Sequence, residues 1–362
     1  MKILYLTDPG IDYLADQIYI GLCRVLGAEQ VIDFPHKPQY HDPNNKTPFL
    51  PQIPGRRYEE EEIVSMLERT EIDLLVLSSP REGVIRSLEK FSRYAHPPRV
   101  LLDGEDDTRI RAALFDKLGC CLYFKREYPR QEETSVGCVL RGLNKVGRQR
   151  NIGSRIHPLP FSVILDVIPA SLLSQGKDLD ISYAGRVSHR KRLQAVSRLQ
   201  KAGDIRFEGG VYAEVTDRRS KLATNAFSSL SAKLCGDPYV SDSERGRKLS
   251  HAEYYKLLGR SKMGLSIRGG GFDTLRYWEI VACKVLLVSE QPDIVIPNNF
   301  EHRKHVIFCR PDLTDLVDLV RMYAHEDTIR EEMVNSAYHH LLKFHTCERR
   351  AEQLLAVCKQ TL

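Results

Sequence analysis

Carboxylates crowd one loop in the first third of the chain. The run LLDGEDDTR carries Asp103, Glu105, Asp106 and Asp107 directly after an apolar segment that predicts a buried strand. Open parallel sheets bind their ligands at the carboxyl ends of their strands, so these side chains stand where chemistry is usually done. Because neighbouring carboxylates raise one another's pKa, one of them could serve as a general base near neutral pH.

The candidates for such a base are Asp103, Glu105 and Asp106, followed by Asp8 at the end of the first predicted strand. A structural explanation of the acidic loop is equally open. Asp107, or Thr108 after it, could cap the helix that is expected over 109–118, since short polar side chains accept hydrogen bonds from the first N–H groups of a helix.

Three consecutive glycines mark a second candidate site. They follow an apolar run at 263–267 and precede a segment whose apolar residues recur with helical spacing, which leads to another apolar run at 285–288. This order of strand, loop, helix and strand is one parallel-sheet unit, with Asp273 as the expected N-cap of the helix. Glycines let a ligand approach the backbone closely, and the N–H groups of a helix start attract phosphate. The unit therefore predicts an anion site at Gly270 and Gly271, while a plain loop remains the alternative.

Basic side chains follow the strand that is expected at 180–184. Arg186 comes directly after this strand, and Arg190, Lys191 and Arg192 begin the next helix. In a parallel sheet this strand end and the glycine loop lie at the same edge, where such side chains can bind a diphosphate by charge-assisted hydrogen bonds. A helix with a solvated basic face is the alternative explanation for at least one of them.

Strands and helices alternate through both halves of the chain, which predicts parallel sheets that are covered by helices on both faces. The expected fold class is therefore α/β with two Rossmann-like domains. A polar segment at 171–177 is the predicted boundary between an N-terminal domain over 1–170 and a C-terminal domain over 178–345. Residues 346–362 predict a last helix that could pack back on the first domain.

Size, charge and cysteine content narrow the class of protein. The chain has 362 residues, a formal net charge of +5 and a pI near 8.6. This mild excess suits a phosphorylated ligand or, through the basic stretch at 126–155, an anionic membrane surface, but it falls short of a nucleic-acid-binding signature. Nine scattered cysteines without a CxxC pair indicate reduced thiols in a cytoplasmic protein. No metal site and no cofactor is expected, and no stretch is apolar enough to span a bilayer.

Several segments of the C-terminal half carry a family pattern. They are RYWEIVAC at 276–283, LLVSEQPDI after it, and FHTCERRAEQLL near the end of the chain. Together with the Gly-Arg strand end and the glycine loop, they resemble the group 1 glycosyltransferases of the GT-B fold, over roughly 180–358. The stretch SKMGLSIRGGGFDTLRYWE is also similar to exostosin-type transferases. The N-terminal half matches in architecture and in a DGEDD…YFKRE segment. The implied fold is GT-B, in which two Rossmann-like domains face each other across a cleft.

The resemblance implies a nucleotide-sugar donor held mainly by the second domain. Glu279 matches the glutamate that binds the ribose hydroxyls, and Arg186 and Lys191 match the diphosphate-binding pair, with Arg190 able to replace Lys191. The other donor-binding candidates are Gly270, Gly271, Asp273, Thr274 and Arg276. Many members carry a further glutamate eight residues before the ribose-binding one. That position is Gly271 here, so a sugar contact must come from elsewhere, with Asp273 as the first candidate.

The function expected from the resemblance is metal-independent transfer of a sugar from a nucleotide-diphosphate sugar to an unknown acceptor. The acceptor could be a glycan, a lipid-linked molecule or another compound. Contact with an anionic membrane is a further expectation, and nucleic acid is not an expected partner. Two other functions stay open: a nucleotide-sugar epimerase of related fold, and a nucleotide-binding protein without catalysis.

Overall fold

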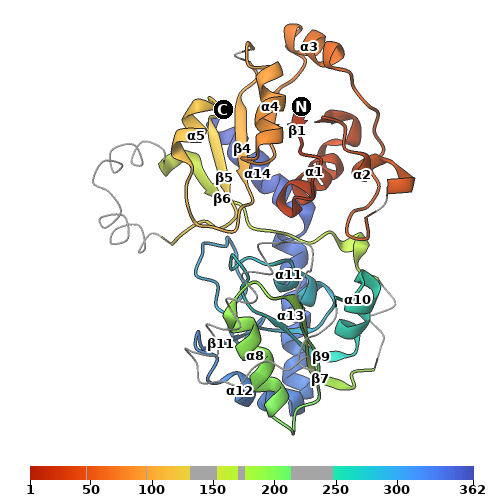
Figure 1. The fold of residues 1–362 in the computed structure, drawn as a ribbon, viewed down its shortest axis with the longest axis vertical. Coiled ribbons are helices and arrows are strands. Elements are labelled where there is room, and N and C mark those ends of the chain that lie inside the picture. The colour runs from red at the N-terminus through yellow and green to blue at the C-terminus, as the bar shows by residue number, and fades with distance from the viewer. Residues whose placement is uncertain (46, 95, 131–152, 170–175, 213–247) are drawn as a thin grey trace.

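Two parallel sheets, one in each half of the chain, form the framework of the molecule (Figure 1). The structure is a computed structural model, and it describes residues 1–362 except 46, 95, 131–152, 170–175 and 213–247. The two sheets and their flanking helices confirm the expected α/β fold class with two Rossmann-like domains. The basic stretch at 126–155, a polar stretch at 209–250 and the boundary segment at 171–177 lie largely outside the described residues.

The first sheet has six strands in the order β2-β1-β3-β4-β5-β6. Its strands are β1 (Ile3–Leu6), β2 (Val31–Phe34), β3 (Leu74–Leu77), β4 (Arg99–Asp103), β5 (Leu122–Lys125) and β6 (Ile156–Pro158). Every pairing is parallel, with Ile3 beside Val31 on one side and beside Leu74 on the other. Because β1 and β3 are buried on both faces, they are continuous apolar runs in the sequence.

Helices cover both faces of this sheet. They are α1 (Tyr13–Leu26), α2 (Pro38–His41), α3 (Glu60–Glu68), α4 (Glu82–Lys90) and α5 (Ala112–Lys117), joined by α14 (Cys347–Thr361) from the end of the chain. The α14 helix packs along α1, so both termini lie in the upper half of Figure 1. The crossing is close, because a Cβ on Gly21 would lie 2.2 Å from the carbonyl oxygen of Cys347.

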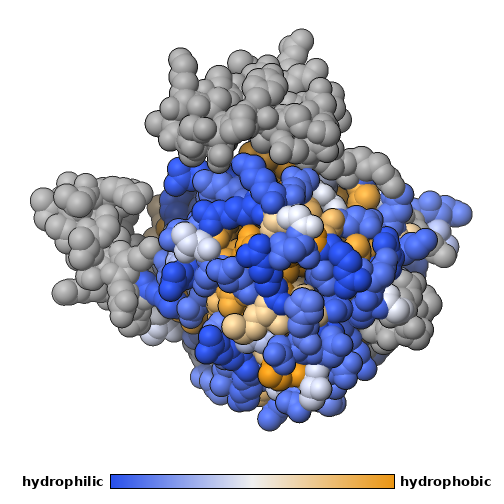
Figure 2. Space-filling view, turned by 90° about the horizontal axis from the view of Figure 1, so that it is seen from below, coloured by the Kyte–Doolittle hydropathy of each residue, from blue (hydrophilic) through white to orange (hydrophobic). Residues whose placement is uncertain are grey.

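The second sheet has five parallel strands in the order β11-β10-β9-β7-β8. They are β7 (Leu179–Arg186), β8 (Phe207–Tyr212), β9 (Ser261–Ser266), β10 (Leu286–Glu290) and β11 (Ile307–Cys309). The helices around them are α8 (Arg190–Lys201), α10 (His251–Gly259), α11 (Leu275–Ala282), α12 (Leu316–His325) and α13 (Asp327–Phe344). The lower face of this domain is mostly hydrophilic, with apolar side chains gathered near its middle (Figure 2).

One expectation about local structure is wrong. The helix expected over 109–118 begins at Ala112 with Arg111 as its N-cap, so neither Asp107 nor Thr108 caps it. The apolar run at 159–168 follows β6 as a connecting segment, and its apolar side chains fill the core between the two domains.

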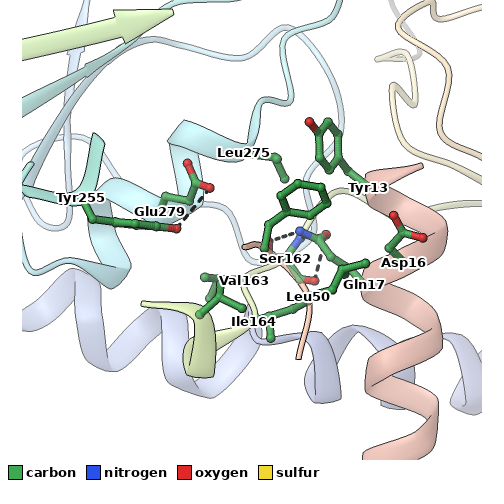
Figure 3. A pocket seen from close by; sticks show the side chains of 12 residues that line it. Tyr13, Asp16, Gln17, Leu50, Ser162, Val163, Ile164, Tyr255, Leu275 and Glu279 are labelled. Atoms are coloured by element: carbon green, nitrogen blue, oxygen red, sulfur yellow. Dashed lines mark hydrogen bonds between the residues drawn. The ribbon is translucent and has the colours of Figure 1, made fainter. Parts of the chain in front are cut away.

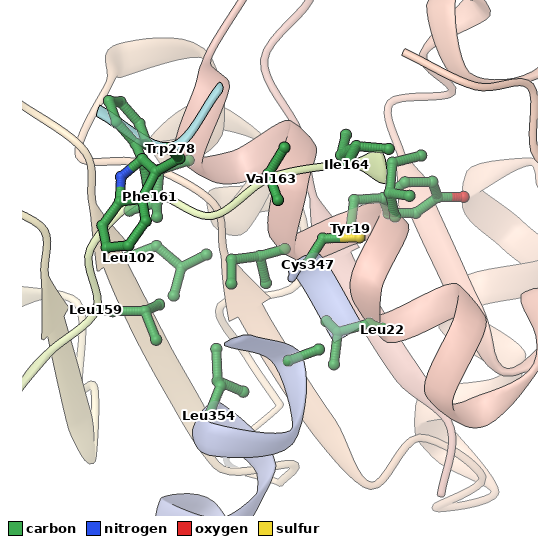
Figure 4. Packing of buried hydrophobic residues seen from close by; sticks show 14 of the residues in the cluster. Tyr19, Leu22, Leu102, Leu159, Phe161, Val163, Ile164, Trp278, Cys347 and Leu354 are labelled. Carbon is green, nitrogen blue, oxygen red and sulfur yellow. The ribbon is translucent and has the colours of Figure 1, made fainter. Parts of the chain in front are cut away.

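One hydrophobic cluster extends across both domains. It contains Leu102, Leu159, Phe161 and Val163 from the first domain and the connection, Trp278 from α11, and Cys347 and Leu354 from α14 (Figure 4). Trp278 is fully buried in this cluster. The two domains are therefore joined by shared apolar packing as well as by the polar contacts described below. Within the described residues, every helix is too short or too polar to cross a lipid bilayer.

Candidate active site

The carboxyl ends of β7, β9 and β10 gather the basic residues and the glycine loop of the second domain. These strands are neighbours in the sheet, so Arg186, the glycine loop (Gly269, Gly270 and Gly271) and Glu290 come to one edge. Arg192 joins two of the strand ends, because its guanidinium donates to the carbonyl of Arg186 at 2.8 Å and to that of Arg268 at 3.0 Å. Since Arg192 is buried, it positions the loops rather than facing a ligand.

Lys191, one of the two expected diphosphate ligands, contacts a carboxylate of its own domain. Its Nζ lies 2.5 Å from Oε2 of the buried Glu290, whose Oε1 accepts a hydrogen bond from the N–H of Arg268 at 2.9 Å. Arg186 and Arg190 are exposed at the same edge. A diphosphate at this edge would meet Arg186 and Arg190 directly, whereas Lys191 would have to share its charge with Glu290.

The glycine loop meets the first domain through Glu127. This residue lies just after β5, and its carboxylate accepts hydrogen bonds from the backbone N–H groups of Phe272 at 2.9 Å and Asp273 at 2.8 Å. Glu127 is buried, and this burial raises its pKa to about 7; the charge of Arg126 acts in the opposite direction. A carboxylate of the chain itself thus occupies the N–H groups at which the sequence predicts an anion.

Close approach explains why this loop consists of glycine. A Cβ on Gly271 would lie 2.4 Å from Oε1 of Glu127, and a Cβ on Gly270 would lie 2.5 Å from Oδ2 of Asp106. Both glycines therefore face acidic side chains of the first domain. The position where the resemblance expects a glutamate is occupied by Gly271, and the carboxylate of Glu127 lies directly beside it.

Asp273 joins the two domains and is not the N-cap of α11. The N-cap is Thr274. The Asp273 carboxylate accepts hydrogen bonds from the N–H of Phe161 at 2.5 Å and from the Nε1 of Trp278 at 2.8 Å, and its carbonyl accepts one from Arg126 at 2.8 Å. Burial raises the pKa of Asp273. Donors from distant parts of the chain have outweighed the local capping preference, and they leave this carboxylate directed into the core.

Two further donor-site candidates, Thr274 and Arg276, hold α11 in place. The hydroxyl of Thr274 lies 3.0 Å from that of Ser266 at the end of β9. The guanidinium of Arg276 donates to the carbonyl of Ala184 at 3.1 Å and lies over the ring of Tyr183. These contacts connect α11 to β7 and β9, so both residues fix the helix that carries Glu279.

Glu279 faces a pocket between the two domains (Figure 3). The hydroxyls of Tyr254 and Tyr255, on α10, donate to its carboxylate at 3.0 and 3.4 Å. Burial raises the pKa of Glu279, and the two tyrosine hydrogen bonds and Arg276 act against that rise. The other residues that line the pocket are Tyr13, Asp16, Gln17, Phe49, Leu50, Ser162, Val163, Ile164, Val167 and Leu275.

The size of this pocket limits what it can hold. Its volume is about 30 Å³, which suits one or two water molecules and is far too small for a nucleotide sugar. A ligand that reaches the Glu279 carboxylate must therefore displace side chains along the boundary between the domains. Sequence reasoning found Glu279 from its family motif, but it gave no indication of the tyrosine pair.

The carboxylates of the acidic loop differ in their surroundings. Two of them belong to a network of ion pairs beneath the loop. Asp103 is completely buried; its oxygens lie 3.0 Å from Nζ of Lys125 and 2.6 Å from Nη1 of Arg111, and the hydroxyl of Tyr123 donates to it. Asp107 contacts the same Arg111 at 2.9 Å. Both groups therefore serve an ion-pair network beneath the loop.

The remaining candidates are more accessible. Asp106 is 68% exposed at its side chain, pairs with Arg126, and faces the glycine loop across the domain boundary. Glu105 follows the end of β4 by two residues, and its Oε1 lies 3.7 Å from Nε of Arg81. Asp8 is partly exposed and accepts a hydrogen bond from the N–H of Gly10 at 2.9 Å. Among these candidates, Asp106 is brought together with the second domain.

Sequence reasoning missed Arg126 and Glu127 as parts of this site. They follow β5, which is the same strand-end position that singled out the acidic loop after β4. The signal was therefore present in the YFKRE segment, where charged residues come directly after an apolar strand. Their partners in the glycine loop are about 145 residues away in the chain, and no local pattern predicts a contact over that separation.

Comparisons with known proteins agree with this architecture. Residues 217–356 match a family model described as Glycosyl transferase-like. A glycosyltransferase from Rickettsia africae superposes with a TM-score of 0.64 at 11% identity, covering 99% of this chain and 98% of that one. Anabaena HepE, solved with UDP-glucose, gives 0.60 at 10% identity over 99% and 100% of the two chains. Sucrose-phosphate synthase from Thermosynechococcus elongatus gives 0.58 at 10% identity over 99% of each. A sequence comparison with curated proteins gives no match.

These findings confirm the resemblance that the sequence motifs predict. The family match covers most of the second domain, and the fold match covers nearly the entire chain. The expected class of enzyme is confirmed with it. The chain has the GT-B fold, and residues 217–356 of its C-terminal half are similar to a glycosyltransferase-like family.

Proposed function

We propose that this protein transfers a sugar from a nucleoside-diphosphate sugar, bound by the second domain, to an acceptor bound by the first. The observation that carries the proposal is the position of Glu279, which lines the pocket between the domains. It lies five residues beyond the cap Thr274, which is about 7 Å along the axis of α11. This is roughly the distance from a diphosphate at the helix start to the ribose of the same nucleotide. A diphosphate that used the N–H groups of Phe272 and Asp273 would have to displace Glu127.

In this proposal the nucleotide lies along the edge of the second sheet. The Glu279 carboxylate accepts hydrogen bonds from the ribose hydroxyls, while Arg186 and Arg190 neutralise the diphosphate, joined by Lys191 when it leaves Glu290. Charge-assisted hydrogen bonds from basic side chains stabilise the departing diphosphate, which is the role that a metal ion fills in other transferases. We therefore propose that the transfer step itself needs no metal.

The first domain supplies the side chain that acts on the acceptor. We assign this role to Asp106, because it is exposed and faces the glycine loop from its ion pair with Arg126, while Asp103 is buried and Asp107 shares Arg111 with it. A general base must reach the acceptor hydroxyl beside the bound sugar, and Asp106 is the member of the acidic loop nearest to the donor side. Membrane contact through the basic stretch at 126–155 is a further proposal. It rests on the sequence, because residues 131–152 lie outside the described part of the chain.

Two measurements test this function. The Anabaena neighbour was solved with UDP-glucose, so UDP sugars are the first donors to screen by thermal shift. A ligand at 100 times its Kd stabilises the folded state by about 2.7 kcal/mol, which a melting curve resolves. The stabilising donor is then incubated with the enzyme without acceptor. Slow release of free sugar supports transfer, an isomerised donor indicates an epimerase, and binding without turnover indicates a protein without catalysis.

Metal independence of the transfer is tested with the same donor. Turnover without added Mg²⁺ or Mn²⁺ should equal turnover in their presence, because the proposed diphosphate ligands are basic side chains. A rate that rises manyfold on adding either ion, while the melting temperature of the free enzyme stays constant, would contradict this part of the proposal.

A further inference from the structure

Two histidines and an aspartate converge at the carboxyl end of β2, away from the edge of the second sheet. Asp33 is a buried residue of β2, His36 follows the strand, and His41 ends α2. One carboxylate oxygen of Asp33 lies 3.1 Å from Nε2 of His41, and the other lies 3.6 Å from Nδ1 of His36. One ligand atom from each residue lies within 4.8 Å of the other two.

The hydrogen bonds of His41 indicate which of its ring nitrogens carries the proton and which one directs a lone pair at the Asp33 carboxylate. Its Nδ1 lies 2.9 Å from the carbonyl oxygen of Ile53, which can only accept, so Nδ1 carries the proton. In the neutral ring, Nε2 is then an acceptor that points at Asp33, with the hydroxyl of Tyr19 at 3.3 Å. Two electron pairs facing each other at 3.1 Å repel unless a proton or a metal ion lies between them.

His36 repeats this situation on the other carboxylate oxygen. Its Nδ1 is buried and, within the described part of the chain, has no hydrogen-bond partner. The rings of His36 and His41 are stacked 4.6 Å apart and nearly parallel, so one ring must turn before both nitrogens point at the same ion. A buried ring nitrogen without a partner is costly in a folded protein, and a bound cation would satisfy it.

The nearby cation of the chain itself is directed elsewhere. Lys37 donates its backbone N–H to Asp33 at 2.6 Å, but its Nζ lies 2.6 Å from Oδ1 of Asp16 and 2.9 Å from the carbonyl of Gly10. Its ammonium group is thereby committed to Asp16. The space between the two imidazoles and the carboxylate is therefore not neutralised by this side chain.

The distances fit a tetrahedral transition-metal ion. Zinc binds imidazole nitrogen and carboxylate oxygen at about 2.0–2.2 Å, which places neighbouring ligand atoms about 3.3–3.5 Å apart. The two separations from Asp33, 3.1 and 3.6 Å, bracket this value, and all three ligand atoms lie within 4.8 Å of one another, so an ion would draw them closer. The bond from His41 Nδ1 to a backbone carbonyl is also the outer contact that orients metal-ligating histidines. We propose that Asp33, His36 and His41 bind one Zn²⁺ ion, with water in the fourth position.

Such an ion would attach the long polar segment at 36–57 to strand β2 of the first sheet. His36 and His41 belong to the polar insertion at 36–57, and Gly55 packs so closely that a Cβ there would lie 2.4 Å from the His41 ring. The same insertion supplies Phe49 and Leu50 to the wall of the pocket that Glu279 faces. A metal at this place would hold that wall in position from outside the donor site, so the proposal is independent of the transfer chemistry.

The test is zinc binding by the full-length protein. After treatment with a chelator and exchange into metal-free buffer, the protein is titrated with Zn²⁺ by calorimetry, and retained zinc is measured by elemental analysis. The expected result is one zinc per chain and a higher melting temperature with zinc. His36→Asn and His41→Asn should each weaken zinc binding at least tenfold. His339→Asn, a matched change at an exposed residue of α13, should bind as the unchanged protein does.

Each outcome decides the proposal. If the unchanged protein binds no zinc, the cluster is an ion pair in which a proton on His41 faces Asp33, and the proposal fails. It also fails if the His36→Asn variant retains zinc as well as the His339→Asn control. His41→Asn could unfold the segment, because it removes the bond to Ile53. In that case the His36→Asn variant, which loses no hydrogen bond of its ring Nδ1, decides alone.

Discussion

At the scale of single residues, the Glu279 carboxylate has two possible roles, which are binding a ligand and holding neighbouring helices together. Its carboxylate already accepts hydrogen bonds from Tyr254 and Tyr255, so it could simply hold α10 and α11 together. The ribose hydroxyls of a nucleotide would add to these bonds or replace them. The sequence motif predicts that Glu279 is important, and the structure identifies the two roles that must be separated.

Glu279→Gln should weaken binding of a nucleoside diphosphate by about tenfold or more. A hydrogen bond to a charged group contributes about 1.5–3 kcal/mol, and each 1.4 kcal/mol is a factor of ten in Kd. Calorimetry with UDP beside a melting curve measures both effects, and Glu331→Gln on the exposed face of α13 is the control. Unchanged affinity together with a lower melting temperature would assign Glu279 to structure instead.

The carboxylates of the acidic loop should divide by their burial. Asp106→Asn is expected to lower turnover by about 100-fold or more while donor affinity stays nearly constant, since a general base contributes that much. Asp103→Asn should instead destabilise the fold by about 3–5 kcal/mol, because it leaves the buried Lys125 without its carboxylate. Turnover with saturating donor and urea unfolding distinguish the two. Full turnover in Asp106→Asn would remove it as the base.

The sequence could not rank these carboxylates. Four acidic residues within five positions look alike in a sequence, and their difference arises from Arg111, Lys125 and Arg126, which other elements bring to the loop. The cluster of Asp33, His36 and His41 was missed for a related reason. Its spacing is not one of the familiar metal motifs, and its geometry depends on how the insertion folds back on β2.

At the scale of elements, the contact between β5 and the glycine loop is sensitive to pH. Burial raises the pKa of Glu127 to about 7, above its value in the unfolded chain. Between about pH 4.5 and 7 the unfolded state has released a proton that the folded state keeps. Stability from this group is therefore present at low pH and is lost as the pH rises through about 7.

This effect is measured by comparing the unchanged protein with Glu127→Gln, which cannot titrate. The difference in unfolding free energy, unchanged protein minus variant, should fall as the pH rises from 5 to 7.5. Urea titrations at several pH values give that difference directly. A difference that rises over this range would mean that the two backbone hydrogen bonds hold the Glu127 carboxylate ionised.

The packing of α14 on α1 gives a second prediction for elements. Gly21→Ala would place a Cβ 2.2 Å from a backbone oxygen of Cys347, and a backbone atom cannot move aside as the end of a side chain can. Overpacking of this kind costs about 1–3 kcal/mol, although alanine favours a helix over glycine. The control is Gly203→Ala, where a Cβ would meet no atom within 4 Å. Equal melting temperatures for the two variants would contradict the close crossing.

Strands and helices were largely predictable from the sequence, because buried parallel strands such as β1, β3 and β9 leave apolar runs between amphipathic segments. The errors occur where tertiary contacts decide. The Asp273 carboxylate, which was expected to cap α11, instead accepts hydrogen bonds from Phe161 and Trp278. The run at 159–168 is apolar because it fills the space between the domains. The periodicity of apolar residues predicts which side chains are buried, but it does not predict which other segment they pack against.

At the scale of the whole molecule, the two domains share one hydrophobic cluster, and each domain also has a cluster of its own. The shared cluster around Trp278 contains residues of β4, the connecting segment, α11 and α14, so each domain buries part of its apolar surface only against the other. Asp273 adds polar contacts from the same place to Phe161 and Arg126. A donor that reaches the small pocket at Glu279 must move side chains at this boundary. The free energy needed to separate those side chains therefore weakens the measured affinity for the donor.

The shared core predicts that the protein unfolds in a single calorimetric transition, although chains of this size often unfold domain by domain. Asp273→Asn should lower the melting temperature while the transition stays single. The amide can accept a hydrogen bond through its oxygen alone, so either the N–H of Phe161 or the Nε1 of Trp278 loses its buried acceptor, at a cost of about 1–3 kcal/mol. An exposed change such as Asp318→Asn on α12 is the control. Two separated transitions in the unchanged protein would show that the domains fold independently and that the common cluster does not couple them.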